Sequence, residues 1–224
     1  MKHRFFMPFV GNKYQKGIMG KKILAVGASF YCNHTECKFF SNCTDEENKN
    51  SSPLDKLCPE YEKVGKLLHN EPSYCIEDAP RTYKKFATYI SKLIGNDNYE
   101  EAWSHIAFTN YVQFFLPSRS NYFRETRISD LSERDFHAFN ETLVQLQPNI
   151  VIIWGCIFNS RLREQNEFLV DLGELDRTEW YVCHIKITGV DHEIALINPY
   201  HPSSSAWFSN IETFDKYISR ELSK

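Results

Sequence analysis

The segment from Asn198 to Ser205 combines the residue types that could act on an anionic ligand. It reads Asn-Pro-Tyr-His-Pro-Ser-Ser-Ser. Two prolines stiffen the backbone around His201, whose imidazole can donate a hydrogen bond to a developing oxyanion. Ser203, Ser204 and Ser205 supply hydroxyls and backbone N–H groups just before a predicted helix, an arrangement that can hold phosphate. The alternative for this segment is a rigid surface turn with a capping histidine.

Two further polar clusters follow predicted strands. Residues 27–32 read Gly-Ala-Ser-Phe-Tyr-Cys. The glycine lets a ligand approach the backbone, and Tyr31 can form a pocket wall. The amide of Asn110 offers one acceptor and two donors, which can pair with a lactam edge such as N3–H and O4 of uracil. The alternatives are an ordinary strand-to-loop turn and a buried asparagine that ties two loops together.

The elements that must position these clusters are strands separated by helices. Apolar runs predict strands over residues 22–30, 105–112, 149–155, 180–187 and 192–198. Helices are predicted over 83–93, from Ser132 to Pro148, over 158–172 and at the C-terminal end. Residues 1–21 are expected to form an irregular arm. This order predicts an α/β protein, a three-layer α/β/α sandwich with a mostly parallel sheet, in which ligands bind beyond the carboxyl ends of the strands.

Two of the predicted helices carry distinct signals. Ser132-x-x-Asp135 resembles a capping box with Asp in place of Glu. Apolar residues then recur at helical spacing, at Phe136, Phe139, Leu143 and Leu146. A second stripe marks the C-terminal helix, at Ile211, Phe214, Ile218 and Leu222.

Length and composition favour one cytoplasmic domain over the whole chain. The 224 residues, with 42% hydrophobic and 25% charged residues, suit a single packed domain over 1–224 with a polar, cysteine-rich insertion at about 32–78. No apolar run approaches the roughly 20 residues that cross a bilayer, and no signal peptide is recognisable. We therefore expect a cytoplasmic protein, monomeric and without a membrane partner.

The net charge of −3 argues against a strongly basic nucleic-acid binder, so DNA binding would need a local basic surface. Arg119, Arg124 and Arg127 lie in a polar loop after the Asn110 strand and could contact DNA phosphates. The alternative is a solvated loop whose charges pair with Glu125 and Asp130.

Five of the seven cysteines crowd into the polar insertion, and in a cytoplasmic protein they are reduced thiols or metal ligands. They are Cys32, Cys37, Cys43, Cys58 and Cys75. No C-x-x-C pair is present, so we expect no cofactor and no metal in the candidate site. A Zn or Fe–S site through Cys32, Cys37, Cys43 and Cys58 is the alternative.

Four motifs in sequence order resemble those of the uracil-DNA glycosylase superfamily over residues 22–208. Residues 27–32 resemble the first motif, G-Q-D-P-Y-H, and residues 108–112 (Phe-Thr-Asn-Tyr-Val) resemble the strand whose Asn reads uracil. Residues 152–155 (Ile-Ile-Trp-Gly) are similar to the third core strand, which ends in W-G. His201-Pro202-Ser203 resembles the final motif, H-P-S-P-L-S. The N-terminal Met-Pro-Phe-Val-Gly also resembles a poorly characterised, glycosylase-like bacterial group.

The resemblance implies DNA, single-stranded or uracil-containing, as the partner and a flipped uracil-type base as the ligand. The base pocket would be lined by Gly27, Ala28, Phe30, Tyr31 and Asn110. Tyr31 would stand where the family excludes the 5-methyl group of thymine, and Asn110 would read the base edge. His201 would donate to O2 of the leaving uracil anion.

The resemblance also implies the surface that holds DNA. Phosphate contacts would come from Ser203, Ser204 and Ser205. Residues 206–208 would lie near the apolar wedge that helps to flip the base, a step that costs a few kcal/mol.

One departure from the family leaves the activity open. The position of the family's water-activating carboxylate corresponds to Ser29 or, in other branches, to Ala28, and neither residue is acidic. Glu77 and Asp78 could supply a carboxylate from the next segment. The hypotheses are a DNA glycosylase that uses His201 and Ser29, a catalytically weakened or inactive nucleobase-binding protein, and a hydrolase with Ser29 as nucleophile and His201 as base.

Overall fold

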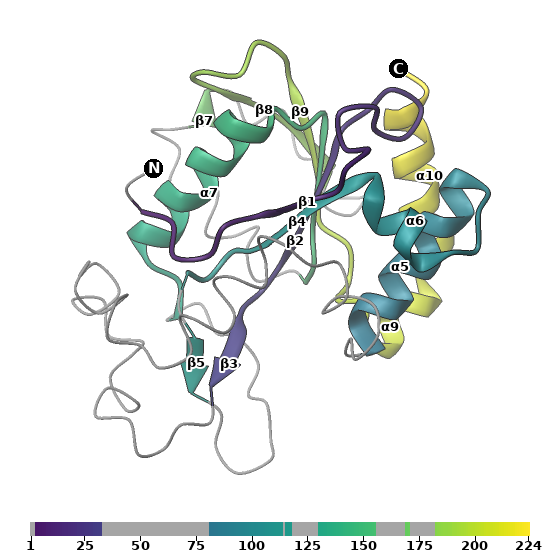
Figure 1. Ribbon diagram of the computed structural model, residues 1–224, viewed down its shortest axis with the longest axis horizontal. Helices are drawn as coiled ribbons and strands as arrows, with labels where there is room; N and C mark the ends of the chain where they lie inside the picture. Colours follow the sequence, from purple (N-terminus) through teal and green to yellow (C-terminus); the bar gives the residue numbers. More distant parts are fainter. Residues whose placement is uncertain (1–2, 33–80, 114, 118–129, 156–168, 171–181) are drawn as a thin grey trace.

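A computed structural model describes residues 3–32, 81–113, 115–117, 130–155, 169–170 and 182–224, which form an α/β fold (Figure 1). Its main sheet has seven strands in the order β1-β4-β2-β6-β9-β8-β7. Their bounds are β1 Phe9–Val10, β2 Ile23–Gly27, β4 Ile106–Asn110, β6 Ile150–Ile153, β7 Leu169–Val170, β8 Val182–Ile187 and β9 Ile194–Ile197.

The centre of this sheet is parallel, as predicted. Strands β4, β2, β6 and β9 pair in parallel, while β1, β8 and β7 pair antiparallel at the two sides. The chain returns from β4 to the other side of β2 before it enters β6, so the strand order reverses at β2. Such a reversal opens a crevice at the carboxyl ends of the strands.

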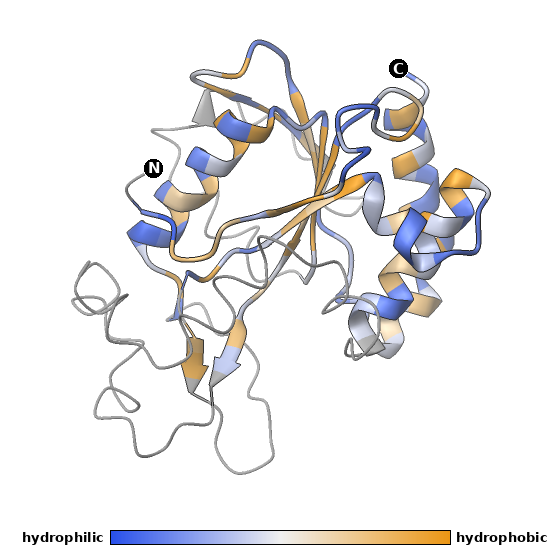
Figure 2. Cartoon of the chain, in the orientation of Figure 1, coloured by the Kyte–Doolittle hydropathy of each residue, from blue (hydrophilic) through white to orange (hydrophobic). Residues whose placement is uncertain are grey.

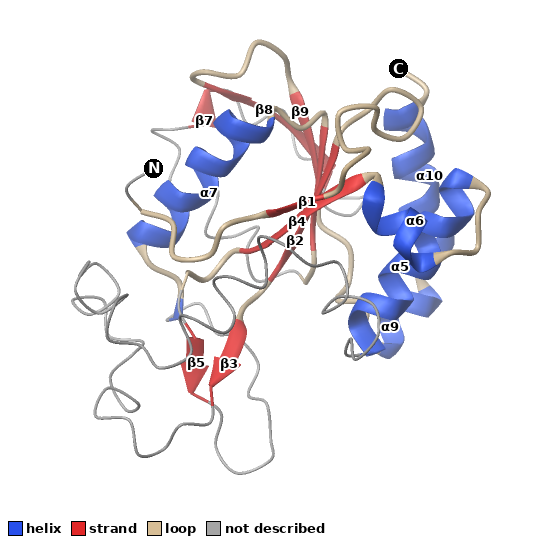
Figure 3. Cartoon of the chain, in the orientation of Figure 1, coloured by secondary structure: helices blue, strands red, loops and turns tan. Residues whose placement is uncertain are grey.

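Alternate residues of the central strands face two separate cores, because successive side chains of a strand point to opposite faces. Ile23 and Ala25 belong to one core, and Leu24 and Val26 belong to the other. The helices on the first face are α5 (Arg81–Ile94), α6 (Tyr99–Ser104), α9 (Ser205–Ser209) and α10 (Ile211–Leu222), and α7 (Glu133–Leu146) lies on the second (Figure 3). The strands between them are predominantly apolar (Figure 2).

The two predicted helix signals are confirmed. Ser132 caps α7, and the side chain of Asp135 accepts a hydrogen bond from the backbone N–H of Ser132, which completes the capping box. The predicted stripe of α7 is buried. In α10, Phe214, Ile218 and Leu222 are buried against the first core.

Three short elements differ from expectation. Residues 9 and 10, expected in an irregular arm, form β1 and pair with β4. Helix α6 begins at an Asn98 cap, whose side chain accepts from the N–H groups of Glu100 and Glu101. The helix expected over 158–172 is wrong at residues 169–170, which form β7 because they pair with β8. The other residues of that expected helix lie outside the described ranges.

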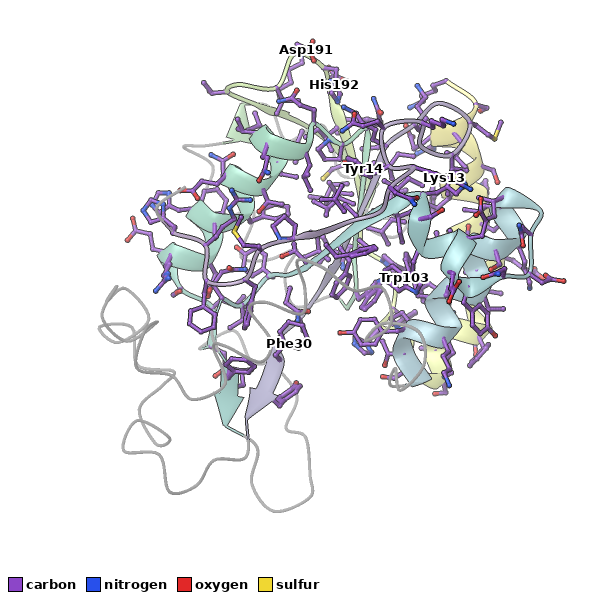
Figure 4. All side chains as sticks on the ribbon, in the orientation of Figure 1. Lys13, Tyr14, Phe30, Trp103, Asp191 and His192 are labelled. Carbon is purple, nitrogen blue, oxygen red and sulfur yellow. The ribbon has the colours of Figure 1, made fainter. Side chains whose placement is uncertain are left out.

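A second, two-stranded sheet extends beyond the ends of β2 and β4. Strand β3 (Phe30–Cys32) pairs in parallel with β5 (Phe115–Pro117), with Phe30 opposite Phe115. The ring of Phe6 packs edge-on against both, with centroids 4.9 Å from Phe30 and 5.2 Å from Phe115. Phe30 thus stands at the junction of the two sheets (Figure 4).

None of the helices described in these ranges has the length and apolar character needed to span a membrane.

Candidate functional site

The predicted polar clusters lie along one edge of the sheet, because the four central strands run in the same direction. Gly27 lies opposite Asn110 in the ladder between β2 and β4. Val26 lies opposite Ile153, and Ile152 lies opposite Ile197, two residues before Pro199. Residues 27–31, 110–113 and 198–205 therefore follow strand ends at this common edge.

Asn110 packs directly over Gly27. An ideal Cβ built on Gly27 would lie 2.4 Å from Oδ1 of Asn110 and 3.1 Å from Cζ of Phe108. The missing side chain is what allows Asn110 to turn inward. Asn110 is only 2% exposed, yet its Nδ2 has no hydrogen-bond partner in the described structure. An unsatisfied buried amide costs about 1–3 kcal/mol, which a ligand acceptor would relieve.

The loop after β2 is tied to the loop after β4. The N–H of Tyr111 donates to the carbonyl of Gly27 at 2.9 Å, and that of Val112 donates to the carbonyl of Ala28 at 3.0 Å. Ala28, Ser29, Phe30 and Tyr31 are all half-buried. These bonds fix the position of the proposed pocket wall relative to Asn110.

Trp154 connects the loops after β2 and β4 with His201, a link that the sequence analysis missed. Its N–H donates to the carbonyl of Val26 at 2.9 Å, which continues the ladder past the end of β6. Its ring centroid lies 5.2 Å from that of Phe108 on one side and 6.0 Å, edge-on, from that of His201 on the other. The indole Nε1 is buried and unpaired within the described ranges. The Trp-Gly pair at a strand end was the available signal, but it does not reveal where the ring points.

The loop that carries His201 is fastened to the end of β6. Nδ2 of Asn198 donates to the carbonyls of Ile153 at 2.7 Å and Gly155 at 2.6 Å. The N–H of Gly155 donates to the carbonyl of Pro199 at 2.9 Å. Gly155 has φ +87°, and a Cβ on it would lie 3.9 Å from Cβ of His201. His201 therefore folds back toward the centre of the sheet.

The contacts of His201 define its tautomer. Nδ1 lies 3.3 Å from the N–H of Ser203 and 2.7 Å from Oγ of Ser203. A backbone N–H can only donate, so Nδ1 accepts and the ring proton resides on Nε2. In this tautomer Nε2–H is the donor of the His201 ring.

The three serines have different roles in the turn. Oγ of Ser204 donates to the carbonyl of His201 at 2.8 Å and accepts from the N–H of Trp207, which caps α9. Oγ of Ser203 contacts His201, while Ser203 and Ser205 both remain exposed. The turn therefore stabilises His201 while it presents two serines at the surface.

A cation and an exposed aromatic ring adjoin this turn. Nζ of Lys85, on α5, lies 4.4 Å from the ring centroid of Phe208, on α9, and 3.5 Å from the carbonyl oxygen of Ser203. Phe208 is 57% exposed. The sequence does not indicate that Lys85 and Phe208 lie together. The packing of α5 beside α9 places them in contact.

Several predicted residues lie outside the described ranges. Arg119 and Arg124 fall within 118–129, and Cys37, Cys43, Cys58, Glu77 and Asp78 fall within 33–80. Cys32 is described only as the last residue of β3. Among the described residues, no three His, Cys, Asp or Glu side chains are grouped as metal ligands.

A small cavity lies behind the His201 turn, between the end of β9 and helices α9 and α10. It is lined mainly by Pro199, Tyr200, Trp207, Phe214 and Tyr217, and its volume is about 20 Å³. That space holds roughly one water molecule, so it is not a nucleobase pocket.

A scan against protein-family models gives no match for this chain, and a search of curated proteins finds no significant relative.

Proposed function

We propose that this protein binds a flipped uracil-type base of DNA at the carboxyl edge of its sheet and hydrolyses the N-glycosidic bond of that base. The proposal includes a three-layer α/β/α arrangement of the uracil-DNA glycosylase type. The observation that carries it is the buried Nδ2 group of Asn110, which has no hydrogen-bond partner among the described residues and lies at the same sheet edge as His201.

Asn110 is the residue proposed to read the base. Its amide is 2% exposed and sits against Gly27, so it cannot turn outward to water without a rearrangement. The Nδ2 group can donate to O4 of uracil, and Oδ1 can accept from N3–H. A base without this edge leaves the amide unpaired, which provides selectivity.

His201 is the residue proposed to stabilise the leaving group. Departure of the base breaks the bond between C1′ of the sugar and N1 of uracil, and the electron pair stays on the base as an anion. Donation from Nε2–H to O2 stabilises that anion. Water then adds to C1′ of the oxocarbenium ion and loses a proton to solvent. The Ser29 hydroxyl is the group proposed to orient this water.

The surface beside the His201 turn is proposed to hold the DNA strand. Phe208 offers an aromatic face for a neighbouring base, and Lys85 offers a cation for phosphate. Ser203 and Ser205 are exposed beside them. Arg119 and Arg124 are proposed to add phosphate contacts.

A second candidate is a protein that binds the same base without hydrolysis. It is favoured by Ala28 and Ser29, which place no carboxylate at the positions where a water-activating group would be expected. The two candidates share the pocket and differ only in the chemical step.

One experiment separates the two candidates. Abasic-site formation and equilibrium binding are measured on uracil-containing single-stranded and double-stranded oligonucleotides, with wild type, His201→Ala and Asn110→Ala. His192→Ala is the control. His192, which Figure 4 labels, lies before β9 and His201 lies after it, so the two histidines are at opposite ends of this strand.

If both site variants lose cleavage and the control retains it, the result supports the glycosylase. Uracil-dependent binding without cleavage supports the second candidate. If wild type neither cleaves these oligonucleotides nor prefers them to thymine-containing ones, the proposed function is wrong.

A further inference from the structure

Gln113 lies at the centre of a buried network that ends at Asn110. Its Oε1 accepts from the N–H groups of Phe5 at 2.9 Å and Phe6 at 3.0 Å. Its Nε2 donates to the carbonyl of Asn110 at 2.8 Å. Gln113 is 3% exposed, so these bonds are not in exchange with water.

The backbone of Gln113 is anchored independently to helix α7. Its N–H donates to Oδ1 of Asp135 at 2.6 Å. Oδ2 of Asp135 accepts from the N–H and the hydroxyl of Ser132, both at 2.8 Å, within the capping box. The start of α7 and the N-terminal arm thus hold Gln113 from opposite directions.

We propose that Gln113 is a positioning residue, which sets the orientation of the Asn110 amide by fixing the carbonyl of the same residue. The identity of the ligand that Asn110 would bind rests on the proposed function, whereas the positioning of Asn110 by Gln113 does not. Asn110 is the last residue of β4, and the N–H side of the peptide that follows it is held by the bond from Tyr111 to the carbonyl of Gly27. The bond from Gln113 holds the carbonyl side of the same peptide. Without it the peptide could tilt about the Tyr111 bond, and such a tilt would move the side-chain amide away from Gly27.

The network requires an amide at position 113. The side chain must accept two backbone N–H bonds at Oε1 and donate one bond to a carbonyl, a combination that a carboxylate cannot provide. Gln113→Glu keeps the two acceptor bonds and the volume. It replaces the donor with an anionic oxygen that faces the carbonyl of Asn110.

Protonation of the substituted carboxyl restores a donor, which gives the test a reversible control. Burial raises the pKa of such a carboxyl. The defect of Gln113→Glu is therefore expected at about pH 9, where the carboxyl is ionised, and is expected to recover toward about pH 5, where it is protonated.

The experiment follows the side-chain NH₂ signals of Asn110 in protein labelled with ¹⁵N-asparagine, assigned with Asn110→Asp, across this pH range. Binding of uracil-containing oligonucleotides is measured in parallel. Gln145→Glu is the matched control, because Gln145 also bonds the N-terminal arm, through Arg4, but has no bond to Asn110.

We expect Gln113→Glu to shift the Asn110 signals and weaken oligonucleotide binding about tenfold at about pH 9, with both effects reversed toward about pH 5. We expect Gln145→Glu to leave the Asn110 signals unchanged. Should Gln113→Glu fail to fold, Gln113→Met, which lacks the donor at similar volume, is expected to shift the same signals at every pH.

If a folded Gln113 variant gives the same Asn110 signals as wild type, Gln113 does not position Asn110. A shift of equal size in Gln145→Glu also overturns the positioning role. If no variant and no wild-type protein binds the oligonucleotides, the proposed function fails, while the NMR signals still decide the role of Gln113.

Discussion

Oδ1 of Asn110 occupies the space beside Gly27 where any other residue would place its Cβ, with only 2.4 Å between the two positions. The residues are ladder partners on adjacent strands, so neither backbone can move away without breaking the β2–β4 pairing. The absence of a Cβ at Gly27 therefore determines the conformation of the Asn110 side chain.

Gly27→Ala is expected to destabilise the protein by about 1–3 kcal/mol and to abolish base binding, because the added methyl group displaces the Asn110 amide. Urea unfolding and oligonucleotide binding measure the two effects. In Gly27→Ala/Asn110→Ala part of the stability loss should be recovered, since the clash with Oδ1 is gone. Strictly additive losses would show that the two side chains do not compete for this space.

His201→Ala is expected to reduce the rate of base release about 10²–10³-fold, because the neutral imidazole no longer donates to the departing anion. Ser203→Ala should have a much smaller effect, since the backbone N–H of Ser203 still bonds Nδ1. Single-turnover cleavage assays compare them. The ¹⁵N shifts of the ring should report a protonated Nε2, and a protonated Nδ1 would contradict the assigned tautomer.

Phe208→Ala and Lys85→Gln are expected to weaken the binding of single-stranded oligonucleotides while the affinity for free deoxyuridine stays unchanged. Base stacking on an aromatic ring contributes about 1–3 kcal/mol, which predicts roughly a 5- to 150-fold loss for Phe208→Ala. Fluorescence anisotropy over a salt series is the measurement, and Lys85→Gln should also lower the salt dependence. Lys84→Gln, at the exposed adjacent position of α5, is the control. Equal losses in the two lysine variants would argue against a specific Lys85–Phe208 surface.

Glu221→Gln is expected to cost about 1–3 kcal/mol of stability at neutral pH and almost nothing in strong acid. Burial raises the pKa of Glu221, but hydrogen bonds from Lys224 and His184 outweigh it and hold the pKa below its usual value. The carboxylate therefore stabilises the fold above its unfolded-state pKa of about 4.3, and this contribution is lost as pH falls through the lower folded-state pKa. Thermal unfolding between about pH 7 and pH 3 tests this. A difference between wild type and variant that stays constant over that range would contradict it.

The central strands and main helices could be predicted because their signals are local. The apolar runs that became β2, β4, β6 and β9 are buried on both faces, so no alternation was needed to recognise them. The capping box of α7 involves residues only three positions apart. Strand β1 and the β3–β5 pair could not be found in this way, because two or three residues become a strand only beside a distant partner.

The common edge of the candidate site also followed from the sequence, since parallel strands align their carboxyl ends. The contacts within it did not follow. The ring of Trp154 between Phe108 and His201 depends on how α5 packs on the sheet, and the Lys85–Phe208 pair depends on two helices more than a hundred residues apart. Such placements arise from side-chain packing across the fold, which no local pattern encodes.

The docking of Phe5 and Phe6 onto Gln113 has a consequence for biosynthesis. During translation these phenylalanines leave the ribosome about a hundred residues before their acceptor does, and Phe9 likewise precedes its ladder partner Phe108. Contacts of such long sequence separation form late and slowly. Until the chain has been made as far as Gln113, the rings of Phe5, Phe6 and Phe9 cannot form these contacts, and apolar surface that is exposed in this way favours aggregation.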